Sequence, residues 1–448
     1  MLQTLKNALK VKDIRKKLLY TFFALIVVRI GSNLVIPGVN PDSIKAFFDE
    51  FAASGFFDAF TGGSFSQMSI FALSITPYIT SSIIVQLLTI AIPKLEEMQK
   101  DGEDGRKKIA EITRYLSVAL AVIESAAMAI GFSQKGYIDK DWKIVCMMVV
   151  SMTAGSSFLM WLGERITEKG IGNGISIILL INIVSRVPND IKSLYVQFIK
   201  NQDIMFNKLM SALVIIGIIL FVVVFVVILS EAERRIPVQY AKKLQGRKQV
   251  GGQSTYIPLK VNTAGVIPVI FTTSILQLPI MISGLFGVQA ASGIGADGKH
   301  VGVWPMILKL LSSSSWFKFD SLSEFKYSLG VIIYLVLLVF FAYFYTSITF
   351  NPIEVSNNMK KQGGFIPGFR PGKATTEYLT DVLNRIILIG VTGLAIVAII
   401  PLFFEGAFGA QVSFGGTSII IIVGVVIETM KQVESQMLVR HYKGFLSE

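Results

Sequence analysis

The sequence predicts an all-α, polytopic membrane protein with ten transmembrane helices. Of its 448 residues, 52% are hydrophobic and only 16% are charged, a balance that soluble domains rarely show. Apolar runs long enough to cross a bilayer recur along the chain, and basic residues gather in alternate loops between them. The runs predict the helices, and the alternation of charge predicts the direction in which each helix crosses.

The spans follow from apolar runs read with a window of about 19 residues. The first run comes after a cationic segment, as in a signal peptide, but no small-residue cleavage site follows it, so we expect it to stay in the mature protein. The second is the later half of a broken element, and the others are continuous. In chain order the spans lie near residues 18–36, 74–92, 114–131, 145–162, 173–187, 210–229, 263–286, 328–350, 381–401 and 411–428.

The broken element begins with a segment that cannot cross a bilayer by itself. Residues 64–73 could form a helix of about 15 Å, whereas the hydrocarbon core is about 30 Å thick. Pro77 removes a backbone donor where the apolar helix begins. Four side chains of the segment would be costly in lipid: Ser64, Ser66, Gln67 and Ser69. Broken backbone persists at membrane depth only inside protein or beside water, so this element predicts a pore or a transport path.

The loops differ in their content of basic residues. The segments 1–17, 93–114, 163–170, 230–262, 351–378 and 430–448 together hold 28 Lys and Arg. The segments 37–60, 132–143, 188–208, 287–326 and 402–410 hold 11. The first set is therefore predicted to be cytoplasmic, with both termini inside. Residues 230–262 and 351–378 are basic and contain Gly and Pro, so we expect them to dock a cytoplasmic partner; charge that only sets orientation is the alternative.

The sequence predicts neither catalysis nor metal binding. Cys146 is the single cysteine, and His300 and His441 are the only histidines, which argues against disulfides, a zinc site or histidine-based chemistry. No paired carboxylates, His-Glu motif or Gly-x-Ser-x-Gly lies within or beside the spans. The glycine-rich Gly170–Gly174 lacks the Lys of a phosphate-binding loop. We therefore expect no enzyme activity, no metal and no cofactor.

Motifs in nearly every span and cytoplasmic loop follow one pattern. They are Gly62–Leu88, Trp161–Gly174, Arg234–Lys243, Pro258–Pro268, Asn351–Pro352, Lys360–Gly372 and Gly415–Ser418. These residues resemble the SecY family, the channel subunits of the bacterial Sec protein translocase. The resemblance extends from about residue 15 to residue 446, but the external stretch 287–326 carries no family pattern.

The resemblance implies an hourglass of two pseudo-symmetric halves, each of five spans, with the pore between them. The halves would be residues 1–187 and 210–448, joined by an external connection at 188–209, and the odd number of spans in each half allows the inverted topology. Residues 64–73 would be a plug that blocks the resting channel. Its first eight residues are Ser64, Phe65, Ser66, Gln67, Met68, Ser69, Ile70 and Phe71.

The resemblance also implies a lateral gate between the second and seventh spans. Its candidate residues are Thr80, Gln86 and Leu278. Gln86 could hydrogen-bond across the gate and release when a signal sequence enters, or it could be an ordinary polar contact between helices; the sequence favours neither.

A channel for unfolded polypeptide needs a constriction that is wide when occupied and dry when empty. Rings of apolar side chains achieve this by dewetting. The family's ring corresponds here to Ile75, Ile79, Leu179, Ile270 and Ile421. Ser74 and Thr76 depart from the Gly and Met of the corresponding family positions. That departure concerns the flexibility of the plug hinge and leaves the ring assignment unchanged.

The function implied by the resemblance is a passive, gated protein-conducting channel in a bacterial plasma membrane. It would pass unfolded secretory polypeptides and release transmembrane segments into the lipid. The implied partners are the SecE and SecG subunits, the SecA ATPase, the ribosome, signal sequences, unfolded preproteins and membrane lipids. Cytoplasmic partners would contact Arg234, Arg235, Lys242, Lys243, Arg247, Lys248 and Arg370.

A secondary transporter of a small solute is the alternative function. It would share the broken helix and the inverted halves, but it would need charged or amide groups at the break. The residues that flank Pro77 are Ile, Thr, Tyr and Ile. The pattern therefore favours passage over binding.

Overall fold

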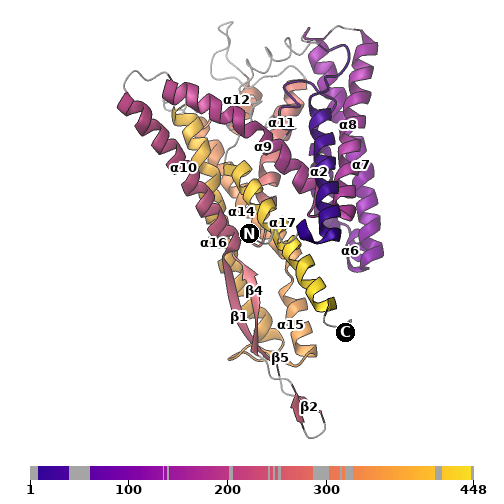
Figure 1. Cartoon of the computed structure of the whole chain (residues 1–448), viewed down its shortest axis with the longest axis vertical. Helices are drawn as coiled ribbons and strands as arrows, with labels where there is room; N and C mark the ends of the chain where they lie inside the picture. Colours follow the sequence, from indigo (N-terminus) through magenta and orange to yellow (C-terminus); the bar gives the residue numbers. More distant parts are fainter. Residues whose placement is uncertain are drawn as a thin grey trace.

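A computed structural model of the protein describes residues 9–39, 61–134, 136–138, 141–200, 205–240, 243–245, 248–250, 254–285, 302–312, 315–317, 326–408 and 416–444. The fold is mainly helical, and each predicted span has a corresponding helix. These ten helices are α2 (Lys12–Ser32), α5 (Thr76–Ala91), α7 (Glu103–Gln134), α8 (Trp142–Lys169), α9 (Gly174–Leu194), α10 (Met205–Glu231), α11 (Ile267–Leu285), α14 (Gly330–Thr349), α16 (Lys373–Phe408) and α17 (Gly416–Gly444). Together they make one bundle (Figure 1).

The helices are longer than several of the apolar runs that predicted them. α7 begins at Glu103, before the predicted start at residue 114, and α16 begins at Lys373, before residue 381. The added turns are polar, and a hydropathy window detects only the apolar part of a helix. Among the described residues, six helices are long and apolar enough to cross a membrane. α5 is followed by α6 (Pro93–Lys100) after a bend of 103°, so the second span ends at this bend.

A small β-sheet projects beyond one end of the bundle (Figure 1). β1 (Glu233–Tyr240) lies between β4 (Ser254–Lys260) and β5 (Gly364–Phe365), and both pairings are antiparallel. Glu233 pairs with Lys260, and Gln239 pairs with both Ser254 and Phe365. The sheet therefore joins the two loops 230–262 and 351–378, which the sequence presented as separate surfaces. A hairpin of β2 (Lys243–Gln245) and β3 (Lys248–Val250) extends from it.

The sheet has a buried face and an exposed face. Ile236 and Val238 of β1 point inward, and the residues between and around them are mostly exposed. They pack with Leu259 of β4, Met359 of α15 (Pro352–Lys361) and Leu379 of α16. This small core fixes the sheet against α15 and α16.

The three largest apolar clusters among the described residues lie within the bundle. One contains residues of α10, α11, α14, α16 and α17, and a second contains residues of α7 and α8 with the segments around Ile36 and Met68. The third combines residues of α2, α8 and α9 with residues of α17. It therefore joins the N-terminal helices to the last one.

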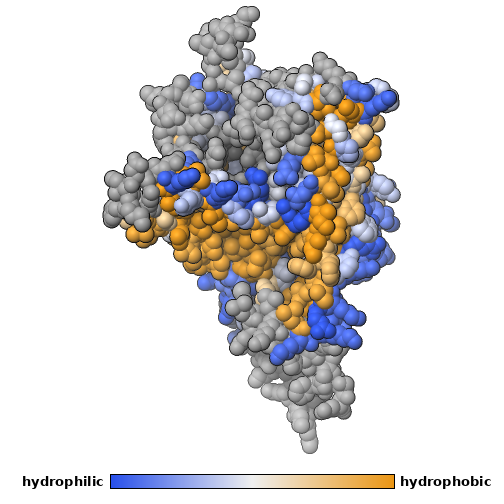
Figure 2. Space-filling view, turned by 45° about the horizontal axis from the view of Figure 1, so that its top comes forward, coloured by the Kyte–Doolittle hydropathy of each residue, from blue (hydrophilic) through white to orange (hydrophobic). Residues whose placement is uncertain are grey.

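The outer surface carries a broad band of apolar residues with hydrophilic residues on both sides of it (Figure 2). Much of the band consists of large side chains that are exposed in the isolated chain, including Leu213, Ile216, Leu220 and Val224 of α10. An apolar belt of this kind suits lipid tails rather than water.

Candidate functional site

The predicted half-helix over residues 64–73 is wrong, because this segment folds as a series of turns. Met68 and Ser74 have positive φ angles of 45° and 51°, which interrupt a right-handed helix. Some of its backbone bonds are turns within the segment, such as Ser69 N–H to the Ser64 carbonyl (2.9 Å). Two others reach outside it: Ile36 N–H donates to the Met68 carbonyl (3.0 Å), and Ile70 N–H donates to the Leu34 carbonyl (2.9 Å). Turns and outside partners thus replace helical hydrogen bonds for these groups.

The segment sits in a closely fitted seat inside the bundle. Met68 and Ala72 are buried against residues of α7 and α8, and Phe71 stacks on Phe158 of α8 with 6.0 Å between ring centroids. A Cβ added at Gly155 of α8 would overlap the carbonyl oxygen of Ile70. The serine side chains that would be costly in lipid are shielded from it here, because Ser64 and Ser69 are buried.

The five residues assigned to the pore ring lie in one apolar cluster. They come from four helices: Ile75 is the N-cap of α5, Ile79 lies in its first turn, and Leu179, Ile270 and Ile421 belong to α9, α11 and α17. Ile75 and Ile421 are 0% and 1% exposed, and Leu179 is buried too, whereas Ile79 and Ile270 are partly buried. Phe71 of the seated segment belongs to the same cluster. The structure thus brings together residues that are up to 346 positions apart in the chain.

Other buried residues of this cluster were not predicted. Among them, Ile183 and Val425 lie one helical turn beyond Leu179 and Ile421. The spacing of four residues was the available signal, because side chains at i and i+4 share one face of a helix.

The predicted gate is an apolar seam. Ile83 of α5, Phe271 of α11 and Phe341 of α14 form a buried cluster, in which the two rings meet edge to face at 5.7 Å. Thr80 is buried on α5, and Leu278 is partly buried on α11. Gln86 Nε2 donates to Ser82 Oγ of its own helix at 3.3 Å, and within the part of the chain that the structure describes its Oε1 is buried without a hydrogen-bond partner. The two roles suggested for Gln86, a cross-gate bond and a contact between helices, stay predictions.

The arginines of β1 are exposed. Arg235 Nε donates to Glu233 Oε1 at 2.6 Å, and its guanidinium lies 4.9 Å from the ring centre of Tyr256. The hydrogen bond to Glu233 raises the pKa of Arg235, so its charge is constant over the physiological range. Arg234 is also exposed, and Lys243 and Lys248 lie in β2 and β3. Lys242 and Arg247 lie outside the described residues.

Arg370 lies at the tip of the 351–378 loop. Gly368 and Gly372 on either side of it have φ angles of 91° and 109°, which turn the chain sharply. Thr375 Oγ1 donates to the Arg370 carbonyl at 2.9 Å, and Phe369 stacks on Tyr378 at 4.1 Å. The backbone of the tip is thereby fixed, while the Arg370 side chain is exposed to solvent.

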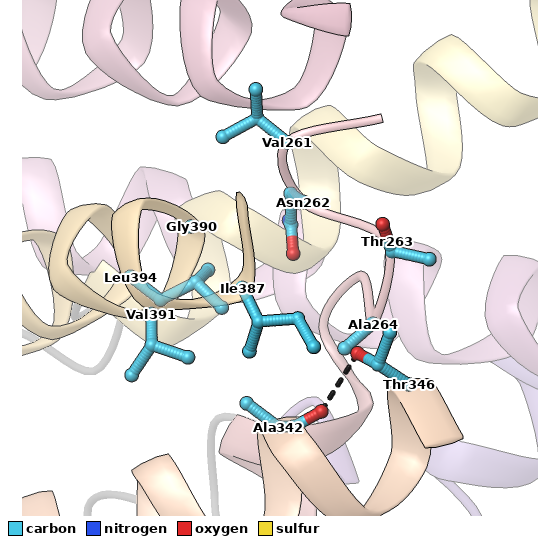
Figure 3. A pocket seen from close by; sticks show the side chains of 10 residues that line it. All are labelled: Val261, Asn262, Thr263, Ala264, Ala342, Thr346, Ile387, Gly390, Val391 and Leu394. Carbon is cyan, nitrogen blue, oxygen red and sulfur yellow. Dashed lines mark hydrogen bonds between the residues drawn. The ribbon is translucent and has the colours of Figure 1, made fainter. Parts of the chain in front are cut away.

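The segment between β4 and α11 borders a small cavity against α14 and α16 (Figure 3). Its polar lining includes Asn262, Thr263 and Thr346, and Thr346 Oγ1 donates to the Ala342 carbonyl at 2.7 Å. The cavity measures about 10 Å³, the space of a single water molecule. It is too small for a solute. Among the described residues, no group of three or more His, Cys, Asp or Glu is placed to hold a metal ion.

Comparison with known proteins gives consistent matches. The SecY family model matches residues 69–430. The chain is 42% identical over 453 residues to the protein translocase subunit SecY of Halalkalibacterium halodurans, and 40% identical over 457 residues to that of Bacillus subtilis; each alignment covers 100% of both chains.

Solved structures share the fold at lower identity. A protein-conducting channel aligns with a TM-score of 0.61 at 20% identity, covering 95% of this chain and 93% of that one. A SecY structure concerned with a plug domain that stabilises the closed channel aligns with 0.64 at 21%, covering 95% and 92%. Sec61 in a canine ribosome–channel complex aligns with 0.59 at 19%, covering 95% and 93%.

Proposed function

This chain belongs to the SecY family and is a protein-conducting channel, and we propose that an apolar ring and a plug close it at rest. The observation that carries the proposal is the single cluster formed by Ile75, Ile79, Leu179, Ile270 and Ile421, with Phe71 of the plug beside them. An empty apolar constriction excludes water and therefore ions. These side chains offer no hydrogen-bonding groups, so the passage of a polypeptide does not depend on its sequence.

The plug is residues 64–73, and the two halves of the channel are residues 1–187 and 210–448. The seat between α7, α8 and the segment around Ile36 supports the first assignment, because it holds the plug by close packing and by only a few backbone bonds. The division into two halves rests on the family resemblance and on the odd number of spans in each half. An odd number of spans inverts the C-terminal half relative to the N-terminal half in the membrane.

The lateral gate lies between α5 and α11, with α14 beside it. Its seam contains Ile83, Phe271 and Phe341. The apolar helix of a signal sequence can take the place of one side of this seam, so that apolar contacts between α5 and α11 are replaced by apolar contacts with the signal sequence. The net free-energy cost of this exchange is small. Thr80, Gln86 and Leu278 border this path in our proposal.

The β4–β1–β5 sheet and the 351–378 loop form the proposed docking surface for SecA and for a translating ribosome. Its exposed arginines, Arg234, Arg235 and Arg370, suit acidic or phosphate-bearing partners. SecE and SecG would cover part of the apolar belt. The channel itself performs no chemistry in this proposal, so the partners or the membrane potential supply the energy.

The chain is a multi-pass membrane protein, and we place it in the bacterial plasma membrane with both termini in the cytoplasm. Single cysteines at positions 250 and 370, in a background without Cys146, should react with an impermeant thiol reagent only from the cytoplasmic side. A cysteine at position 295 should react only from outside. The ratio of 28 to 11 basic residues between the two sets of loops is the physical reason. Reversed labelling would overturn the orientation.

Deletion of residues 64–73 tests the plug. The expected result is a channel that still assembles but leaks ions and accepts preproteins with defective signal sequences. SecA-driven transport of a normal preprotein into reconstituted vesicles should persist, because the ring and the gate are intact. Leak can be measured in planar bilayers that contain the purified channel and its copurifying subunits. Loss of assembled protein, or an unchanged leak, would mark the segment as ordinary core.

A further inference from the structure

Residues on both sides of the plug contact the same residue of α9. Asn182 Nδ2 donates to Ser74 Oγ, directly after the plug, over 3.1 Å. A Cβ built on Gly62, two residues before the plug, would lie 2.9 Å from Asn182 Cα. Asn182 and Ser74 are only 1% and 2% exposed. The contact is therefore shielded from water, where a hydrogen bond has few competitors.

Neighbouring side chains reinforce the contact at Gly62. The Gly62 carbonyl accepts a longer hydrogen bond of 3.4 Å from Arg29 Nη1 of α2. Ser185 Oγ of α9 donates its single hydrogen to the Asn182 carbonyl at 2.6 Å, and it lies 3.4 Å from the Gly62 carbonyl oxygen. The Gly62 backbone, with its φ of 68°, can approach α9 this closely because it has no side chain.

The seated plug also contains features that oppose closure. Ser64 Oγ and Ser69 Oγ are buried without a hydrogen-bond partner among the described residues. Met68 and Ser74 adopt left-handed backbone conformations that L-residues disfavour. A plug that moved into an aqueous vestibule would hydrate both hydroxyls and could relax both backbones. The closed position therefore needs a compensating attachment.

The side chain of Ser74 makes this attachment possible. The left-handed φ of Ser74 favours Gly, yet Gly has no side-chain oxygen that could accept the hydrogen bond from Asn182. The side chain thus serves a contact that Gly cannot make.

We propose that Asn182 is a clasp that holds the plug closed through Ser74, and that it thereby sets how strong a signal sequence must be to open the channel. This inference rests on the proposed role of residues 64–73. Asn182 is a positioning residue in this proposal, because it acts on the channel through its hydrogen bond to Ser74 and not as part of the ring.

The test uses Ser74→Ala, Asn182→Ala and the double variant in the purified channel with its copurifying subunits. Each single variant should leak ions about three- to tenfold more than wild type, the change that loss of one hydrogen bond produces. It should also transport a preprotein with a weakened signal sequence. The double variant should leak no more than the single variants, because the two side chains form one bond.

Two further variants separate the clasp from a general loss of stability. Ser125→Ala removes a buried hydroxyl that contacts Thr153 at 3.0 Å between α7 and α8, and it should leave the leak unchanged. Ser69→Ala removes a buried hydroxyl without a partner, so in the Ser74→Ala background it should lower the leak again. If Ser74→Ala only destabilised the protein, a second core substitution, Ser69→Ala, would not lower the ion leak.

Wild-type leak in both single variants, or a multiplied effect in the double variant, would overturn the clasp. If Asn182→Ala does not assemble, Ser74→Ala, which loses one oxygen atom, carries the test together with Ser69→Ala. The plug deletion distinguishes the two levels of failure. If the deletion of residues 64–73 raises the ion leak but the single variants do not, the clasp is rejected and the plug is retained. If the deletion leaves the ion leak unchanged, the plug itself is rejected.

Discussion

Replacing Ile75 and Ile421 with Ser should make the resting channel leak ions. Both side chains are almost completely buried in the cluster that we assign to the constriction. Burial of an Ile side chain contributes about 1.5–3 kcal/mol, so two hydroxyls should greatly favour water in the empty pore. We expect the ion leak to rise at least about tenfold, which corresponds to about 1.4 kcal/mol. Single-channel recording in planar bilayers measures it.

Ile420 supplies a matched control for this experiment. It is adjacent to Ile421 on α17 and equally buried, but it belongs to the cluster of α10, α14 and α16. Ile420→Ser should lower the melting temperature without raising the leak. Equal leak from Ile420→Ser, or no leak from the ring variants, would show that the constriction lies elsewhere.

Arg370→Glu should stall SecA-driven transport while leaving folding and membrane insertion intact. The side chain is exposed at a tip whose backbone is fixed by Thr375 and by the Phe369–Tyr378 stack. An arginine there can bind a carboxylate with two parallel hydrogen bonds, and reversing its charge places like charges together at a cost of several kcal/mol. Preprotein transport into vesicles with equal amounts of channel should fall at least about tenfold.

Two variants of the same loop isolate the role of this arginine. Lys373→Glu makes the same charge change at an exposed residue nearby and should transport almost normally; its pair with Glu377 spans 3.9 Å and contributes little. Arg370→Lys keeps the charge but loses the paired hydrogen bonds, so it should be intermediate. Wild-type rates in Arg370→Glu would leave the loop with a topogenic role only.

The spans were predictable because long apolar runs in lipid have few alternatives to a helix. Their ends were not, as α7 and α16 show, since polar turns outside the lipid leave no trace in hydropathy. Strands β1 and β4 were missed because their alternation is short, and Pro237 and Pro258 lie within them. The plug conformation was missed for another reason. It depends on backbone bonds from Met68 and Ile70 to residues more than 30 positions earlier, which no local pattern reports.

The candidate site was predicted unevenly. The ring residues were found from motif positions, and the structure places all five in one cluster, but their role as the constriction stays a prediction. The role of Gln86 at the gate stays a prediction as well; the bond from its Nε2 to Ser82, one turn away on the same helix, was not anticipated. The contact between Ser74 and Asn182 joins residues 108 positions apart, and nothing in either local sequence indicates it.

The three-stranded sheet also has a mechanical consequence. β5 lies five residues before Arg370 and is hydrogen-bonded to β1, which is hydrogen-bonded along its length to β4. The Val261 N–H, just after β4, donates to the Ala232 carbonyl at 2.8 Å, and α11 begins six residues later. Strands joined by a ladder of hydrogen bonds resist stretching, so the sheet can act as a stiff lever arm. If Arg370 has its proposed role, we expect force applied at its tip to pass through the sheet to α11, as a torque on one wall of the seam.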